Sequence, residues 1–206
     1  ILNKDSKEIT EEGLIMADAF QKKPQGVWEI IYIGLCENSE ICNWYQSTID
    51  FDRVYSREEM DIILQDSYPD LKDRTLRNPF NSLLNTFKES PLGSTIPVGV
   101  LSKERNKLTL IRHPHNDISL AAVAYSLYRY AERQNRYMLT VSEFYDENQK
   151  EGIYRQFGIG KDILERLLLS LQEESNHVLR VELNMGLDNI ILRDDLKSID
   201  ILKMML

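Results

Sequence analysis

The sequence predicts a mainly α-helical protein with small β-hairpins, built as two tandem winged helix-turn-helix units. In each half of the chain, helical patterns are followed by a hairpin pattern. The capping-box motif Ser56-Arg-Glu-Glu59 recurs 84 residues later as Thr140-Val-Ser-Glu143, and a leucine-rich helical stripe recurs at the same offset. Two features that share one offset indicate a repeated unit. Because both features are common in proteins, a chance match is the competing explanation.

The composition is typical of a folded protein and not of a disordered, fibrous or membrane-spanning one. The 206 residues are 42% hydrophobic and carry a formal net charge of −8, and no apolar run approaches the roughly 20 residues that cross a bilayer. Two cysteines and three histidines are too few for a disulfide framework or a structural zinc site. We therefore expect a cytoplasmic protein without a metal ion or other cofactor.

The chain is expected to divide into three parts. Residues 1–26 would be the tail of a missing N-terminal unit followed by a linking helix that Thr10 caps. Residues 27–116 would form the first, basic unit, and residues 117–206 the second, acidic unit. The sequence opens at Ile1 without an initiator methionine or a leader, which favours a fragment of a longer protein.

The first unit is expected to contain three helical segments and a hairpin. Apolar residues recur near helical spacing within 27–45, although the aliphatic run 30–33 would also suit a strand. We expect the aromatic residues of this segment to pack in a core and not to stack on bases. The capping box at Ser56 then starts a second helix over 57–66.

Pro79 decides where the third helix of this unit is expected to begin. An apolar stripe runs from Phe80 to Phe87 at the i, i+3, i+4 and i+7 positions that face a core. A proline inside a helix costs about 3 kcal/mol, whereas the first helical position tolerates it. We therefore expect Asn78 to be the N-cap and Pro79 the first helical residue, so that the preceding arginines would lie in the turn before the helix.

A hairpin is expected to close each unit. In the first unit, the segments 98–100 and 108–110 alternate apolar and polar residues around a polar turn at 103–106. In the second unit, the strand-like segments 178–183 and 189–193 form the corresponding pair. The hairpin of the first unit is the candidate wing.

The second unit repeats the plan of the first with a different charge. A helical stretch over 118–134 precedes the second capping box, and a stripe from Leu164 to Leu171 follows it, in a helix expected to start near Lys161. Between residues 160 and 193, acidic side chains outnumber basic ones by about two. A negatively charged surface repels phosphate, so we expect this unit to bind other proteins or to form a homodimer.

The segment 72–112 is where we place nucleic-acid binding. It holds eight Lys or Arg against three Asp or Glu, in a chain whose net charge is −8. Cations on a helix and on a hairpin tip suit phosphates, and asparagine amides suit base edges; a solvated charged face is the alternative. The predicted contacts to double-stranded DNA are Lys72, Arg74, Arg77, Asn78, Asn81, Asn85, Lys88, Lys103, Arg105, Lys107 and Arg112.

No motif in the sequence argues for catalysis. Serine, cysteine and histidine form no recognisable nucleophile signature, and Gly158-Ile-Gly160-Lys161 lacks the spacing of a phosphate-binding loop, so we expect a turn there. His113-Pro-His115 has no third ligand nearby and is expected to lie in a loop at a strand end. We therefore predict that the protein is not an enzyme.

Several short motifs resemble those of a bacterial protein family. They are Thr10-Glu-Glu-Gly13, Trp44-Tyr45, Ser56-Arg-Glu-Glu59, Pro91-Leu-Gly93 and the closing LRVELNMGLDNIILRDDLKSIDILKMML. Together they resemble the bacterial domain-of-unknown-function family 4007 over nearly the whole chain, through loose motifs that are not catalytic. Members usually carry a further N-terminal region with a Gly-His-Glu-Thr-Phe-like motif, which this sequence lacks.

The resemblance implies a DNA-linked accessory role. Family members are typically encoded beside phosphoadenosine-phosphosulfate-reductase-like genes, in DNA phosphorothioation or related modification and defence islands. We therefore expect a non-enzymatic DNA-binding regulator or targeting subunit, with DNA-modification or restriction proteins as partners. The alternative is a protein-interaction adaptor that docks such enzymes through its second unit and its aromatic helix without binding DNA. A third reading is a nuclease whose catalytic residues lie in missing sequence.

Overall fold

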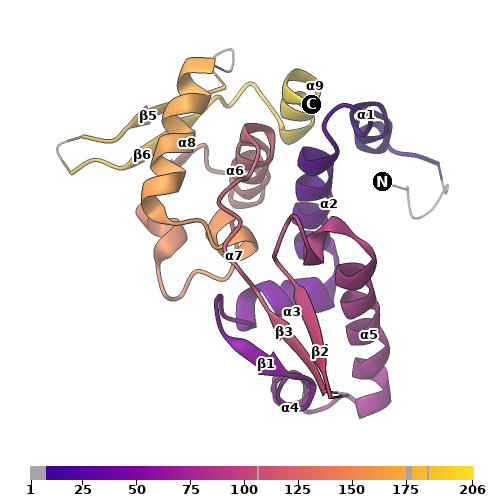
Figure 1. Ribbon diagram of the computed structural model, residues 1–206. Coiled ribbons are helices and arrows are strands. Elements are labelled where there is room, and N and C mark those ends of the chain that lie inside the picture. Colours follow the sequence, from indigo (N-terminus) through magenta and orange to yellow (C-terminus); the bar gives the residue numbers. More distant parts are fainter. Residues whose placement is uncertain (1–7, 106, 175–177, 185) are drawn as a thin grey trace.

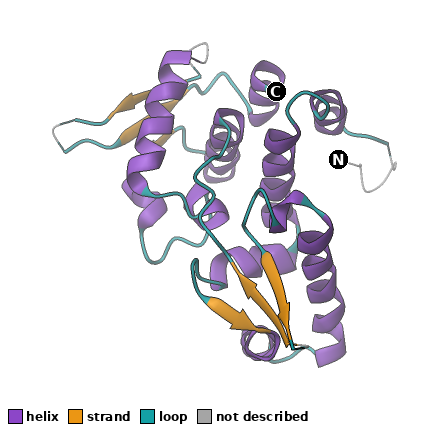
Figure 2. Cartoon of the chain, in the orientation of Figure 1, coloured by secondary structure: helices purple, strands orange, loops and turns teal. Residues whose placement is uncertain are grey.

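The computed structural model describes residues 8–105, 107–174, 178–184 and 186–206. Within them the protein is mainly helical, with a small three-stranded antiparallel sheet in each half of the chain (Figures 1 and 2). This confirms the mainly helical class and both hairpins that the sequence predicts, and it adds a third strand to each hairpin. None of the described helices is long and apolar enough to cross a membrane.

The first half of the chain contains five helices, a 3₁₀ turn and three strands within its described residues. In order, they are α1 (Glu11–Ala19), α2 (Pro24–Asn38), α3 (Glu40–Thr48), β1 (Val54–Ser56), α4 (Arg57–Ser67), α5 (Asp73–Glu89), η1 (Pro91–Gly93), β2 (Val100–Glu104) and β3 (Lys107–Ile111).

The second half continues with four helices, a 3₁₀ turn and three strands in the part that the structure describes. In order, they are α6 (Leu120–Gln134), β4 (Met138–Thr140), η2 (Ser142–Tyr145), α7 (Ile153–Phe157), α8 (Lys161–Glu174), β5 (Leu179–Glu182), β6 (Asn189–Leu192) and α9 (Ser198–Met205).

The two sheets share one topology. Their strand orders are β1-β3-β2 and β4-β6-β5, so in each half a short strand pairs with the last strand of the later hairpin. The buried pairs Tyr55–Leu110 and Leu139–Ile190 occupy equivalent places in the two sheets. Strands β1 and β4 are three residues long, which is too short for an alternating pattern to be recognised in the sequence.

The first capping box forms as the sequence predicts. Ser56 Oγ accepts a hydrogen bond from the Glu59 N–H at 3.2 Å, and the Glu59 carboxylate accepts one from the Ser56 N–H at 2.7 Å, where α4 begins. Thr140 and Glu143 make the same reciprocal contacts at 3.3 and 3.0 Å. Only the 3₁₀ turn η2 follows them. The shared offset therefore marks an equivalent cap but not an equivalent helix.

The start of α5 corrects the sequence prediction. The helix begins at Asp73 and not at Pro79, and Asn78 is a helical residue and not the N-cap. Leu76 is buried, which extends the apolar face one turn ahead of Phe80. Burial of this extra turn offsets the cost of an internal proline, about 3 kcal/mol.

Other helices lie close to their predicted positions. The segment 27–45 is helical and not a strand, but it holds most of two helices, α2 and α3, which are separated at Ser39. Helix α6 covers most of 118–134, and α8 begins at Lys161 directly after the turn at 158–160. Apolar periodicity was sufficient to predict these helices because each of them buries one continuous face.

Replacing Pro79 with alanine is expected to stabilise the protein by about 1–3 kcal/mol. Alanine restores an N–H that can bond to the carbonyl of Thr75 one turn earlier, and Pro79 lies on the exposed side of α5. Urea unfolding measures the difference. Pro69→Ala is the matched control, because Pro69 lies in the exposed turn before α5. Loss of a proline from such a turn should destabilise the folded protein slightly. A P79A variant no more stable than the wild type would contradict the interpretation.

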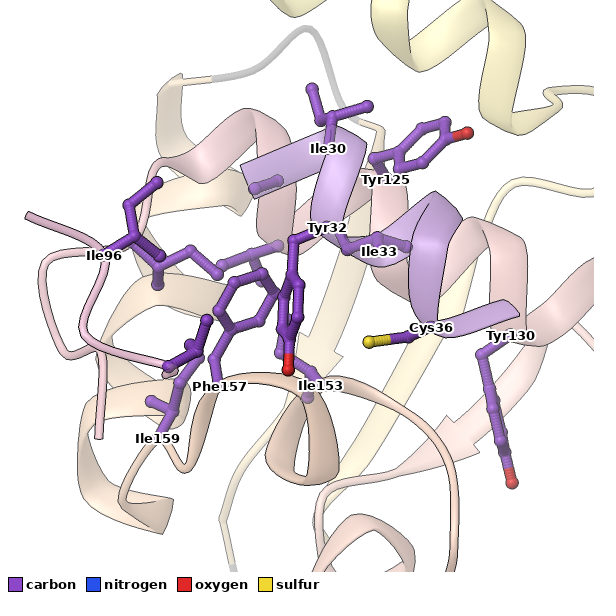
Figure 3. Packing of buried hydrophobic residues seen from close by; sticks show 14 of the residues in the cluster. Ile30, Tyr32, Ile33, Cys36, Ile96, Tyr125, Tyr130, Ile153, Phe157 and Ile159 are labelled. Carbon is purple, nitrogen blue, oxygen red and sulfur yellow. The ribbon is translucent and has the colours of Figure 1, made fainter. Parts of the chain in front are cut away.

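One hydrophobic core runs through both halves of the chain. Figure 3 shows Tyr32 and Cys36 of α2 beside Ile153 and Phe157 of α7. The rings of Tyr32 and Phe157 meet edge to face, with centroids 5.6 Å apart. Burial raises the pKa of the thiols of Cys36 and Cys42, neither of which forms a disulfide. Both cysteines are therefore inert core residues.

A buried carboxylate also joins the two halves. Glu29 of α2 is fully buried and accepts hydrogen bonds from His115 Nε2 (2.7 Å), from the Ser119 N–H (3.0 Å) and hydroxyl (2.5 Å), and from the Gln25 amide (3.1 Å). Ser119 is the N-cap of α6, so the carboxylate lies at the positive end of that helix dipole. Burial acts to raise the pKa of Glu29, but these hydrogen bonds outweigh it and lower the pKa.

Candidate nucleic-acid interface

Helix α5 separates its residues by polarity. Its apolar side packs against α3, α4 and β2 and buries Leu76, Phe80, Leu83, Leu84 and Phe87. The opposite side and the N-cap expose the predicted contact residues Lys72, Arg74, Arg77, Asn78, Asn81, Asn85 and Lys88. The structure therefore places every predicted contact of this helix at the surface. The earlier start of α5 puts both arginines on the helix itself.

The β2–β3 hairpin carries the remaining exposed cations that the sequence predicts. Lys103, Arg105 and Lys107 are exposed near its turn, and Arg105 adopts a left-handed backbone conformation with φ 46°. Asn106, also part of the predicted turn, lies outside the described residues. In Figure 1 this turn and the beginning of α5 lie toward the same end of the molecule, near α4. Because α5 also packs against β2, helix and hairpin can present their cations to one ligand.

We call these exposed side chains of α5, its N-cap and the hairpin the basic face. Between residues 72 and 107 it holds seven Lys or Arg and three Asp or Glu. Arg77 contacts Asp73 at 2.9 Å and Lys88 contacts Glu89 at 2.8 Å, and all four side chains are exposed. Such pairs are weak and are easily exchanged for other ions. Within the described residues no ion pair engages Lys72, Arg74, Lys103, Arg105 or Lys107.

The structure removes Arg112 from the predicted DNA contacts. Its side chain is fully buried, and its guanidinium donates to carbonyl oxygens at the ends of α3 and α7, with the shortest contacts to Ile49 (2.7 Å) and Arg155 (2.6 Å). The ring of Phe51 lies 4.0 Å from Arg112 Cζ. The C-terminal ends of helices carry partial negative charge, so a cation is stabilised between two of them. A basic residue after a strand gives no local signal of such burial.

Arg57 belongs to this corner of the molecule, although it is not among the DNA contacts that the sequence predicts. Its Nε lies 3.0 Å from the Asp61 carboxylate, and its Nη1 donates to Asn81 Oδ1 at 2.9 Å. Its guanidinium carbon lies 4.5 Å from the centre of the Phe80 ring. Arg57 therefore joins α4 to α5. Its place directly after the Ser56 cap is the one local signal that could have identified it.

Hydroxyl groups lie beside the hairpin cations on the outer face of the first sheet. Ser102 and Thr109 are paired across β2 and β3. They border a hollow of about 540 Å³, whose other lining residues are Val54, Glu104, Arg105 and Lys107. Hydroxyls can donate to phosphate oxygens, so this hollow places two such donors beside the hairpin cations.

The corresponding hairpin of the second half has a carboxylate beside each of its arginines. Arg180 contacts Glu182 at 2.5 Å, and Arg193 contacts Asp195 at 2.6 Å. In each pair the carboxylate lies two residues further along the chain. The cations of the first hairpin have no such partner among the described residues, so this hairpin carries more unpaired positive charge than the second.

The two histidines after β3 contact different partners. His113 Nδ1 lies 2.9 Å from the Asp52 carboxylate, and His115 Nε2 lies 2.7 Å from Glu29. The two rings therefore serve separate contacts in the loop after the strand. Over the described part of the chain, no group of three or more His, Cys, Asp or Glu side chains could hold a metal ion.

Comparison with known proteins adds no relative. No protein-family model, curated protein or solved structure matches this chain. The resemblance to the bacterial family therefore stays a prediction, and the basic face is the feature that bears on function.

Proposed function

We propose that this protein is a non-enzymatic DNA-binding protein that contacts duplex DNA through the basic face. The observation that carries the proposal is a group of exposed cations on one helix and one hairpin, five of which have no ion-pair partner among the described residues, in a chain whose net charge is −8. A concentrated positive surface on an acidic protein attracts a polyanion locally while the rest of the molecule repels it. Such a surface also orients the protein on its ligand.

The order of elements supports a winged-helix interpretation of both halves. In the first half, α4 and α5 would be the helix-turn-helix pair, β2 and β3 the wing, and β1 the third strand of the sheet. The second half repeats this order with η2 and α7 in place of α4. In this proposal α5 is the recognition helix in the major groove, and the hairpin tip contacts the adjacent backbone or minor groove.

The biological setting is proposed from the family resemblance alone. We infer a regulator or targeting subunit of a bacterial DNA modification or defence system, acting in the cytoplasm with modification or restriction proteins as partners. The second half, whose hairpin arginines are already paired, would bind these partners or a second copy of the chain.

Binding to duplex DNA is expected to weaken steeply with salt and to depend on the hairpin cations. Each phosphate contact contributes about 0.9 to the slope of log affinity against log salt concentration. The triple variant Lys103→Ala, Arg105→Ala, Lys107→Ala should therefore lower the magnitude of that slope by up to about 3 and weaken binding to every sequence. Fluorescence anisotropy of a labelled duplex over a salt series measures both quantities.

A triple variant elsewhere on the molecule provides the matched control. Lys22, Lys150 and Arg166 are exposed cations outside the basic face, so changing all three to alanine alters the net charge equally. This control should keep the wild-type salt slope. Equal losses in both triple variants would mean that only net charge matters. No binding by the wild type at low salt would overturn the proposed function.

A protein-interaction adaptor is the second candidate function, and one region of the second half favours it. Met138, Leu169 and Leu187 are exposed, and a hollow of about 700 Å³ lies between α8 and the β5–β6 hairpin, with Leu179 and Ile191 in its lining. Exposed apolar side chains and concave surfaces are both found at protein interfaces. The same salt series separates the candidates, because an adaptor that does not bind DNA shows no salt-dependent affinity for the duplex.

A further inference from the structure

We propose that Arg57 is a positioning residue that holds the Asn81 amide with its oxygen toward α4, so that Asn81 turns its N–H groups outward to DNA and disfavours adenine. This inference rests on the proposed binding of DNA through α5. It assigns a specificity-determining role to a residue of α4 that lies outside the basic face.

The Arg57 side chain is held in one orientation by two neighbours. Asp61 accepts from Nε with both carboxylate oxygens, at 3.1 and 3.0 Å, and the Phe80 ring lies 4.5 Å from the guanidinium carbon. The side chain of Arg57 is 22% exposed. A planar guanidinium fixed on one edge and one face points its remaining N–H groups in a defined direction. That direction is toward Asn81.

The contact with Arg57 determines which end of the Asn81 amide faces outward. A guanidinium only donates hydrogen bonds, so the atom that it contacts at 2.9 Å is the amide oxygen of Asn81. The amide nitrogen then points away from Arg57, and Asn81 is exposed. Its two N–H groups can reach acceptors such as phosphate oxygens or the N7 and O6 atoms of guanine.

Adenine recognition needs both ends of one amide. An asparagine that reads adenine donates to N7 and accepts from the N6 amino group at the same time. Arg57 occupies one of the two lone pairs of the Asn81 oxygen and holds this oxygen toward α4, so the amide is not free to turn both of its atoms toward one base, and the contact disfavours adenine. Asn78 and Asn85 lie on the same side of α5, three residues before and four residues after Asn81, and both are exposed. Within the described residues, no hydrogen bond engages their side-chain amides.

The test is a gain of adenine preference when Arg57 is removed. Arg57→Met keeps an aliphatic side chain over Phe80 but offers no donor, so the Asn81 amide can turn. Selection from a pool of randomised duplexes is expected to show a new preference for adenine at one base pair, of about 5- to 100-fold, the range that a bidentate amide contact discriminates. The double variant Arg57→Met, Asn81→Ala should lack this preference, because the effect of the first change requires the second residue.

Two further variants separate positioning from a general structural role. Arg57→Lys keeps a donor for Asn81 and should retain the wild-type preference. Arg53→Met removes the same charge from an exposed side chain nearby, which is 4.0 Å from Glu59, and should also leave the preference unchanged. Urea unfolding checks that each variant is folded. Arg57→Ala serves as a second variant if the methionine is poorly tolerated.

The outcomes distinguish this inference from the function on which it rests. If the wild type binds no duplex at low salt, DNA binding itself is wrong. If the wild type binds but R57M has the same preference at every base pair, only the positioning role is overturned. A new preference that persists in R57M/N81A would also overturn it, because the change would not act through Asn81.

Discussion

Replacing Arg112 with methionine is expected to lower the free energy of unfolding by about 3–5 kcal/mol. Methionine fills much of the same space but donates no hydrogen bond to the carbonyl oxygens of Ile49 and Arg155, which lie 2.7 and 2.6 Å from the guanidinium. The buried contact to Ile49 and the partly buried contact to Arg155 would both be lost, at a cost of about 1–3 kcal/mol for each oxygen left without its charged donor. The variant should therefore lose a large part of a typical domain stability.

The acceptors of Arg112 make this substitution more severe than the loss of many buried ion pairs. A buried pair of side chains can be replaced by apolar residues on both sides, but the backbone carbonyls at the ends of α3 and α7 remain in every variant. The geometry around them is also fixed. Gly158 ends α7 in a left-handed conformation with φ 67°, and a Cβ added there would lie 2.6 Å from the Phe51 ring that covers Arg112.

Urea unfolding measures the effect of Arg112→Met. The free energy of unfolding of Arg112→Lys should lie between those of Arg112→Met and the wild type. An ammonium group keeps the charge but not the planar fork of donors that spans both helix ends. Arg74→Met is the matched control, since Arg74 is exposed and its replacement should change stability by less than about 0.5 kcal/mol. An Arg112→Met variant within about 1 kcal/mol of the wild type would show that the arginine does not link the two helices.

Replacing Glu29 with glutamine is expected to destabilise the protein by about 2–4 kcal/mol at neutral pH. All four hydrogen bonds to the carboxylate come from donors on His115, Ser119 and Gln25. Glutamine has the same shape but turns an N–H2 group toward donors, and it removes the negative charge from the start of α6. The substitution therefore changes the side-chain volume little but disrupts the hydrogen bonds around it.

The same residue should make stability depend on pH in acid. The pKa of Glu29 in the folded protein is lowered from its usual value of 4.5, so below that value the unfolded chain takes up a proton before the folded one does. The contribution of Glu29 is then fully present above the unfolded pKa and is lost as the pH falls through the folded pKa. The stability difference between wild type and E29Q should be constant above about pH 5 and shrink in more acidic solution.

Unfolding curves of both proteins from about pH 3.5 to pH 7 test this dependence. Glu147→Gln is the control, because Glu147 is exposed in the loop after η2 and its loss should not alter the shape of the curve. If the difference between wild type and E29Q stayed the same at every pH, Glu29 would not be the ionised group that the hydrogen bonds indicate.

The candidate interface could be predicted from the sequence in part. The residues of α5 and the hairpin tip are exposed, as expected for a basic surface. The sequence could not show that Arg112 is buried or that Arg57 reaches Asn81, because these contacts join residues 63 and 24 positions apart. A charged side chain is assigned to the surface by default, and only the carbonyl groups around it reverse that assignment.

The sequence by itself determined the elements whose signals are local. The cap at Ser56, the apolar face of α5 and the two hairpins follow from hydrogen bonds and periodicities that act within a few residues. The tertiary structure decided the rest. It paired β1 and β4 with strands far along the chain, buried Leu76 so that α5 starts a turn and a half before Pro79, and enclosed Arg112 between two helix ends. Burial and pairing depend on which distant surfaces meet, and no local pattern contains that information.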